Sequence, residues 1–155
     1  MKKKSISIFG VTGSVGSSTI ELLRQRKDEF EVIALTCNKN IDLLLELSQE
    51  FQPKSIAVSD ENFFLELKKR AGNNFKCFGG KEGLKDIANL HSDIVVASIV
   101  GLAGLSPLLC SIKNSSIIAI ANKECIVAAG SLITESARKN NLSLIHISEP
   151  TRPST

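Results

Sequence analysis

Apolar runs rich in isoleucine and valine alternate along the chain with stretches whose leucines recur at helical spacing. The runs predict strands at 5–9, 31–37, 55–58, 76–78, 94–98, 116–121 and 142–145. The intervening stretches predict helices at 15–26, 41–51, 61–70 (with Asp60 as its N-cap), 81–89, 102–113 and 123–140, the last broken near Gly130. Runs 94–98 and 116–121 show no polar alternation, as expected of strands covered on both faces.

This alternation of strands and helices predicts the α/β class: a Rossmann-like, doubly wound, mostly parallel sheet with helices on both faces. No linker divides the first 145 residues, so we expect residues 1–145 to form one nucleotide-binding domain. Residues 146–155 contain two prolines and four hydroxyl residues, a composition that fits neither a helix nor a core strand. We therefore expect them to form an unstructured tail.

The composition, with 43% hydrophobic and 23% charged residues, is that of a soluble globular protein. The net charge of +3 is modest, and its most concentrated source, Lys2–Lys4, is interpreted as a solvated terminus. The chain has no Trp or Tyr and no basic–aromatic interleaving, so no nucleic-acid partner is expected. No run approaches the ~18 apolar residues of a membrane span. The cysteines Cys37, Cys77, Cys110 and Cys125 form no CxxC pair, which predicts buried free thiols and a cytoplasmic location.

The sharpest local feature is Gly10-Val-Thr-Gly13-Ser-Val-Gly16, between the first predicted strand and the first predicted helix. Glycine lets such a turn pass close to a pyrophosphate, and the amides and positive dipole end of the helix favour its charge. Thr12 and Ser14 can add hydroxyl donors. The spacing is GxxGxxG rather than GxGxxG, and a glycine-rich turn without a ligand is the alternative. Its position between a strand and a helix favours a dinucleotide.

The end of the second predicted strand bears on which dinucleotide binds. Enzymes that prefer NAD usually place a carboxylate there for the ribose 2′-hydroxyl. This chain has Thr36-Cys-Asn38-Lys39-Asn40, with no carboxylate. Lys39 would attract a 2′-phosphate, which predicts NADPH over NADH. The alternative is a solvated lysine on a turn.

A second polar group, Asn122-Lys123-Glu124, follows the predicted strand 116–121. Ligands of open α/β sheets bind at the carboxyl ends of strands, which favours a binding role. Glu124 would equally suit the first turn of a solvated helix. The residues alone leave both interpretations open.

These elements, together with Ala97-Ser-Ile-Val-Gly101-Leu-Ala-Gly104-Leu, occur in an order and spacing that resemble the 1-deoxy-D-xylulose 5-phosphate reductoisomerase family over residues 4–145. The resemblance implies that Thr12, Gly13, Ser14 and Val15 hold the cofactor pyrophosphate. It implies that Asn38, Lys39 and Asn40 face the 2′-phosphate ribose, that Asn122 and Glu124 lie at the nicotinamide side, and that Lys123 reaches the substrate. Asn38 stands where the family usually has glycine.

The family catalyses a step of isoprenoid-precursor biosynthesis, in which a sugar phosphate is rearranged and reduced by NADPH with the help of Mg²⁺ or Mn²⁺. The resemblance also implies a homodimer for full-length members. The family's metal-binding Asp-Ser-Glu-His element has no counterpart here, since this chain has Ile147-Ser-Glu-Pro150. We therefore assign no metal ligand and no catalytic residue. We expect a truncated or frame-shifted product with a foreign tail from near His146, weak or absent NADPH binding and no turnover.

Two alternatives remain. An aspartate-semialdehyde-type NADP-dependent dehydrogenase would share the glycine-rich turn and need a nucleophilic cysteine, for which Cys125 is the candidate. A non-catalytic NADP(H)-sensing module would keep the turn but have no reason to keep Asn122, Lys123 and Glu124.

Overall fold

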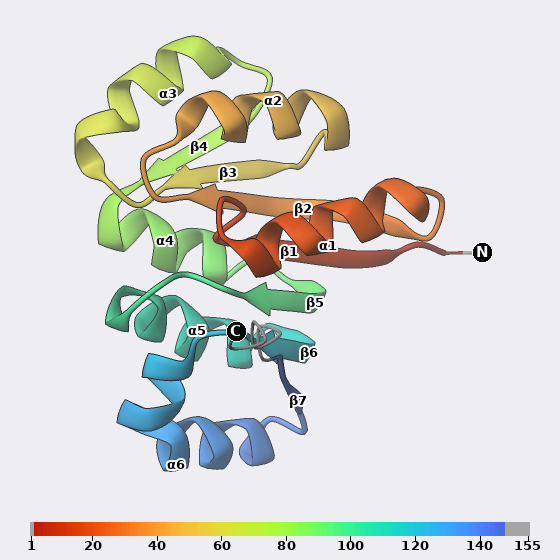
Figure 1. Cartoon of the computed structure of the whole chain (residues 1–155), viewed down its shortest axis with the longest axis vertical. Helices are drawn as coiled ribbons and strands as arrows, with labels where there is room; N and C mark the ends of the chain where they lie inside the picture. Colours follow the sequence, from red (N-terminus) through yellow and green to blue (C-terminus); the bar gives the residue numbers. More distant parts are fainter. Residues whose placement is uncertain (1, 148–155) are drawn as a thin grey trace, which may run out of the picture.

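The computed structural model describes residues 2–147 as a single α/β sandwich (Figure 1). Strands alternate with helices along almost the whole described chain, as the apolar pattern predicts. The strands are β1 (Lys4–Phe9), β2 (Phe30–Cys37), β3 (Ser55–Val58), β4 (Lys76–Gly79), β5 (Ser92–Ala97), β6 (Ser115–Ile120) and β7 (Ser143–His146).

The helices lie close to their predicted ranges, but two of them begin with a 3-10 turn. They are α1 (Ser14–Gln25), α2 (Ile41–Phe51), η1 (Glu61–Phe63) with α3 (Phe64–Ala71), α4 (Gly80–Ala88), η2 (Leu102–Gly104) with α5 (Leu105–Ile112), and α6 (Lys123–Lys139). Asp60 is confirmed as a cap, since its carboxylate accepts a hydrogen bond from the Asn62 N–H at 2.9 Å. The predicted break in α6 is also confirmed, at Ala129.

All neighbouring strands are parallel, in the order β4-β3-β2-β1-β5-β6-β7. The chain starts in the middle of the sheet, builds outward to β4, and then returns to the other side of β1. Two strands far apart in sequence, β1 and β5, thus become neighbours, with Phe9 paired to Ala97 at their carboxyl ends. This reversal of strand order is where open α/β sheets leave a crevice for a ligand.

Each face of the sheet is covered by its own set of helices (Figure 1). One core cluster joins the sheet to α1, α2 and α3, and the second joins it to α4, α5 and α6. Within β5, Val96 belongs to the first cluster and Val95 to the second. Both sets of alternating side chains are therefore buried, which explains why the central strands read as continuous apolar runs. The doubly wound fold is confirmed.

The last strand changes one expectation about the tail. The strand β7 runs to His146, and the Ile147 N–H donates to the Ile120 carbonyl at 2.8 Å. The expected start of an unstructured tail at residue 146 is thus wrong for these two residues, because pairing with β6 continues through them. The rest of the expected tail, 148–155, lies outside the described residues. Within 2–147, no helix has the length and apolar character needed to cross a bilayer.

Candidate functional site

The glycine-rich turn leaves β1 through a conformation that two of its glycines make possible. Gly10 has φ +90°, and a Cβ there would lie 2.6 Å from the Ser98 carbonyl oxygen. A Cβ at Gly16 would overlap the Gly10 carbonyl oxygen and lie 2.8 Å from the Val11 Cα. At these two positions a side chain is therefore excluded by the protein's own backbone, whether or not a ligand is bound.

Gly13 has a different environment. The nearest atom to a Cβ at this position is the Gly10 carbonyl oxygen, at 4.0 Å. Gly13 is the N-cap of α1, so no side chain caps this helix, and its first turn holds no acidic residue. The first turn of α1 therefore brings no carboxylate of its own to the positive end of the helix dipole.

Ser98, directly after β5, fixes the start of the turn. Its hydroxyl donates to the Phe9 carbonyl at 2.7 Å and contacts the Gly10 carbonyl at 3.1 Å, and its backbone N–H donates to the Phe9 carbonyl at 2.9 Å. On the other side, the Gly10 N–H donates to Thr36 Oγ1 at 2.9 Å. Sequence reasoning missed the role of Ser98. The signals available were its position at the end of a buried apolar run and its place in the segment 97–105.

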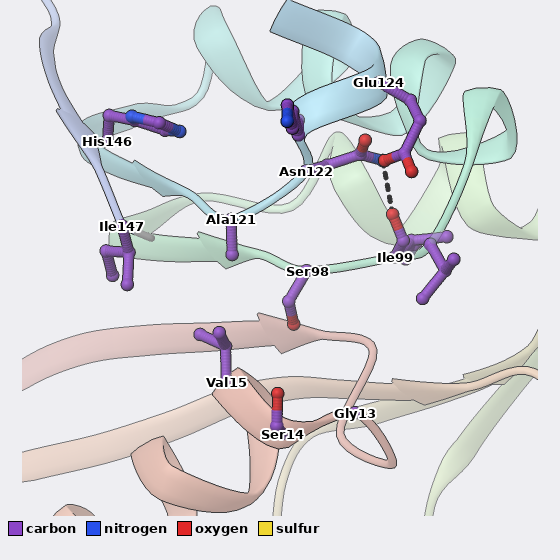
Figure 2. A pocket seen from close by; sticks show the side chains of 12 residues that line it. Gly13, Ser14, Val15, Ser98, Ile99, Ala121, Asn122, Glu124, His146 and Ile147 are labelled. Carbon is purple, nitrogen blue, oxygen red and sulfur yellow. Dashed lines mark hydrogen bonds between the residues drawn. The ribbon is translucent and has the colours of Figure 1, made fainter. Parts of the chain in front are cut away.

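A cleft of about 550 Å³ opens at this edge of the sheet (Figure 2). Its walls come from residues 13–15 at the start of α1, 98–100 after β5, 121–124 at the start of α6, and 146–147 at the end of β7. Figure 2 shows the α1 residues on one side and Asn122, Glu124 and His146 on the other. The volume is within the range of small-molecule and cofactor sites.

Asn122 occupies a position unlike the one its polar neighbours suggested. It is only 5% exposed, and its Oδ1 accepts from the Cys125 N–H at 3.0 Å as the N-cap of α6. Its Nδ2 donates to the carbonyls of Ile99 and Gly101, the latter at 2.6 Å. Asn122 lines the cleft, but its side-chain amide forms its hydrogen bonds with other residues of the protein.

Lys123 and Glu124 both line the cleft from the first turn of α6, and both are exposed. Their ammonium and carboxylate groups are therefore accessible from solvent at the same wall. A bound ligand in the cleft could reach either group without displacing a core side chain.

Four of the predicted residues lie outside the lining of this cleft. Thr12 is exposed at the tip of the turn, and Asn38, Lys39 and Asn40 follow β2, the neighbour of β1. The Lys39 ammonium lies 3.9 Å from Asp60 Oδ2, a carboxylate that sequence reasoning assigned only to helix capping. Asn40 caps α2 by accepting from the Leu43 N–H at 3.1 Å.

Asn38 is a mild departure from the glycine usual in the family. Among the described residues, the non-glycine residues with positive φ are Gln52 and Asn141. Asn38 is not among them, so its side chain is placed there without backbone strain.

The four cysteines are free thiols. Burial raises the pKa of the Cys37 thiol to about 12. The pKa of Cys125 is also raised, first by burial and then by the charge of Glu124. A buried, protonated thiol is a poor nucleophile. Cys125 therefore does not fit the role that the dehydrogenase alternative requires.

Within 2–147 we find no group of three or more His, Cys, Asp or Glu side chains placed to hold a metal ion.

A parallel sheet with a glycine-shaped turn and a cleft at its β1–β5 crevice defines a Rossmann-like domain, the class of α/β fold that binds dinucleotides. The profile of the 1-deoxy-D-xylulose 5-phosphate reductoisomerase family matches residues 6–130. The chain belongs to this family.

Relatives with this name are similar over nearly the whole chain. The chain is 40% identical to the enzyme of Clostridium perfringens (strain 13) over 148 residues and 43% identical to that of Bacillus cereus (strain Q1) over 146 residues. Each alignment covers 93% of this chain but 38% of the relative. The chain thus spans well under half the length of these relatives.

Solved structures give the same picture. The Zymomonas mobilis reductoisomerase in complex with NADPH superimposes with a TM-score of 0.90 at 30% identity, over 94% of this chain and 38% of that one. A DOX-P reductoisomerase in complex with NADPH, fosmidomycin and magnesium gives 0.87 at 36% identity, over 92% and 36%. A hyperthermophilic archaeal homoserine dehydrogenase gives 0.60 at 18% identity, a likeness of fold alone.

Proposed function

We propose that this chain binds NADPH as the cofactor domain of a 1-deoxy-D-xylulose 5-phosphate reductoisomerase. The whole enzyme would convert 1-deoxy-D-xylulose 5-phosphate to 2-C-methyl-D-erythritol 4-phosphate by intramolecular rearrangement and hydride transfer, in the non-mevalonate route to isoprenoids. One observation carries the proposal: the uncapped start of α1, shaped by glycines, faces a cleft of about 550 Å³ at the β1–β5 crevice.

The pyrophosphate would lie against Thr12, Gly13, Ser14 and Val15. The open space over Gly13 lets a diphosphate approach the backbone, and the N–H groups and dipole of α1 would stabilise its charge. Gly10 and Gly16 would act indirectly, by allowing the turn to adopt this shape. The turn therefore fits a dinucleotide phosphate by both space and charge.

The adenosine ribose and its 2′-phosphate would lie by Asn38, Lys39 and Asn40, at the end of β2. Lys39 is 64% exposed on its side chain, so its ammonium is available to an incoming phosphate. Asp60 is the competing group, because it already attracts Lys39 and would repel a phosphate. We infer that Lys39 supplies the preference for NADPH and that Asp60 moderates it.

The nicotinamide would enter the cleft on the side of Asn122 and Glu124, with Lys123 directed to an anionic group of the sugar phosphate substrate. Hydride transfer requires the nicotinamide and the substrate to be held in near-attack geometry. The contribution of this chain is to bind the cofactor and to present these groups at one wall.

A divalent cation, Mg²⁺ or Mn²⁺, would act in the whole enzyme as a Lewis acid on the substrate oxygens. The described residues do not fit that ion, since they offer no cluster of three carboxylate, imidazole or thiol ligands. No step of the reaction is therefore assigned to the ion through residues 2–147.

The wider assignments follow from the same proposal. We assign residues 1–145 to the NADPH-binding domain, supported by two core clusters that join every strand from β1 to β7 to its helices. The free thiols support a cytoplasmic location. For the whole protein we propose a homodimer that acts on a small sugar phosphate, with no nucleic-acid or membrane partner.

The test is a titration of the purified chain with NADPH and NADH, followed by calorimetry. We expect NADPH to bind more tightly than NADH, and Lys39→Glu to reduce the ratio of the two affinities by at least about tenfold, since one charge-assisted hydrogen bond contributes about 1.5–3 kcal/mol. Lys54→Glu is the matched control, because Lys54 is an exposed lysine paired with Glu31 before β3, at the opposite end of the strands. An unchanged ratio in Lys39→Glu, or equal effects of the two variants, would refute the assignment of Lys39.

A further inference from the structure

We propose that Asn122 is a positioning residue: its side-chain amide clamps the loop between β5 and α5, residues 98–104, into the wall of the cleft. In this role it acts on the cofactor through the loop and not by donating to it. The effect on NADPH rests on the proposed function, whereas the clamp itself is a property of the chain without ligand.

The hydrogen bonds of the Asn122 side chain account for all of its donors. A primary amide has two N–H groups, and here they go to the carbonyls of Ile99 and Gly101 (Figure 2 marks the bond to Ile99). The Oδ1 atom accepts from the Cys125 N–H at 3.0 Å. With the residue 5% exposed, no N–H of this amide remains for a ligand.

The middle of the loop has little packing to hold it. Val100 is 79% exposed and Leu102 is 61% exposed, whereas Ser98 bonds to the turn after β1 and Ile99 packs against the second core cluster. Gly101 has φ +77°, a conformation that favours glycine and that the clamp stabilises by binding its carbonyl. The Cys125 thiol adds a weaker contact to the same carbonyl at 3.7 Å.

Gly104 shows how closely the loop and the clamp fit together. A Cβ at this position would lie 2.9 Å from Asn122 Nδ2 and 2.9 Å from the Ile99 carbonyl oxygen. The amide therefore sits in a space bounded by backbone on several sides. Since Ile99 and Val100 line the cleft, a shift of this loop would change the shape of the cleft itself.

A substitution can separate the two tasks of Asn122. In Asn122→Asp the side chain can still accept from the Cys125 N–H, and a carboxylate suits the start of a helix. The variant loses both donors and places a carboxylate against two carbonyl oxygens. We therefore expect α6 to persist while the loop is released.

The experiment measures backbone hydrogen exchange of the purified chain without ligand, and then its affinity for NADPH. For Asn122→Asp we expect exchange in residues 99–104 to rise about tenfold, as the loss of about 1.4 kcal/mol would produce, and the affinity for NADPH to fall. The control is Asn140→Asp, at the other end of α6, which loses one exposed hydrogen bond to the Ser136 carbonyl. It should leave exchange in 99–104 and NADPH binding unchanged.

A second variant tests the same loop in case Asn122→Asp does not fold. Gly101→Ala strains the φ +77° position without touching Asn122 and should produce the same two effects. If Asn122 acts through the loop, the double variant should bind NADPH no more weakly than either single variant.

The proposal is overturned if Asn122→Asp weakens NADPH binding while exchange in 99–104 stays at the wild-type rate, because that pattern indicates direct contact. It is also overturned if the loop is released with no change in affinity. If the wild-type chain did not bind NADPH, the proposed function would be refuted. Hydrogen exchange of Asn122→Asp and of the wild type without ligand would still show whether Asn122 holds the loop.

Discussion

The glycines of the turn after β1 perform different tasks, although the sequence presents them as one motif. At Gly16 an added Cβ would overlap backbone, so Gly16→Ala should reduce the free energy of unfolding by about 1–3 kcal/mol. At Gly13 the space is open and φ is −80°, so Gly13→Ala should change the free energy of unfolding by no more than about 1 kcal/mol, since alanine restricts the unfolded chain but is a poorer N-cap than glycine. Urea unfolding of the two variants measures this difference.

The same pair tests the binding site. Gly13→Ala places a methyl group where the diphosphate would approach, so it should weaken NADPH binding in a fully folded chain. If Gly13→Ala bound NADPH like the wild type, the cofactor would not approach this part of the turn. If it unfolded as readily as Gly16→Ala, the described shape of the turn would be wrong.

Cys37 makes stability depend on alkaline pH. Burial raises the pKa of its thiol to about 12, from an ordinary value near 9. Between these values the unfolded chain loses the proton while the folded chain keeps it, so the free energy of unfolding should fall as pH rises. The slope from this group is at most about 1.4 kcal/mol per pH unit.

Replacing the Cys37 thiol tests whether it causes this fall in the free energy of unfolding with pH. Cys37→Ala should flatten the decline in stability between pH 9 and 11, although it lowers stability at pH 7 by leaving a small cavity. Cys110→Ala, which keeps Cys37, should retain the steep decline. A decline of equal slope in both variants would show that Cys37 is not its source.

At this scale the sequence identified residue types better than residue tasks. Asn122, Lys123 and Glu124 do come to the cleft, as their place after an apolar strand suggested. The clamp made by Asn122 could not be predicted, because its acceptors, Ile99 and Gly101, belong to a loop whose course depends on the pairing of β5 with β6. Ser98 was missed because its acceptors, Phe9 and Gly10, are brought to it by the pairing of β1 with β5.

At the scale of elements, periodicity was sufficient to find the strands and helices but not all their ends. Helix α3 begins at Phe64 and α5 at Leu105, each after a 3-10 turn that hydrophobic spacing does not distinguish from a first helical turn. The sequence predicted a doubly wound parallel sheet, but not the order of its strands. The neighbours of β1 are decided by long-range pairing, with β5 some 88 positions away in sequence.

The kink in α6 gives a prediction at this scale. The backbone departs from helical geometry at Ala129 (φ −142°, ψ 28°), while a Cβ at Gly130 would meet nothing within 4 Å. Gly130→Ala should therefore raise the free energy of unfolding by about 0.5–1 kcal/mol, since glycine inside a helix is less favourable than alanine. Gly83→Ala is the contrasting variant in α4, where the Cβ would lie 3.1 Å from Phe78 and should destabilise. A lower melting temperature for Gly130→Ala would mean that the kink requires glycine.

At the scale of the whole molecule, residues 2–147 form the cleft that we assign to the cofactor, and they leave the metal ligands and the catalytic residues unassigned. The chain spans 38% of the length of its Clostridium and Bacillus relatives, and residues 2–147 provide no metal cluster. We predict that the purified chain binds NADPH weakly and does not oxidise it with 1-deoxy-D-xylulose 5-phosphate and Mg²⁺ or Mn²⁺, measured by NADPH absorbance. Steady, substrate-dependent oxidation of NADPH would contradict this prediction.

The most direct measurement follows the backbone amides of the 16.7 kDa chain by heteronuclear NMR while NADPH is added. Hydrogen bonds from the start of α1 to a diphosphate should shift the amide resonances of residues 13–16 with one saturating curve, and NADH should shift them at higher concentration. Resonances at the opposite, amino-terminal end of the strands should stay in place. If millimolar NADPH did not shift the amide resonances of residues 13–16, or shifted only those of residues away from the cleft, the cofactor would not bind at the start of α1, and the account would be contradicted.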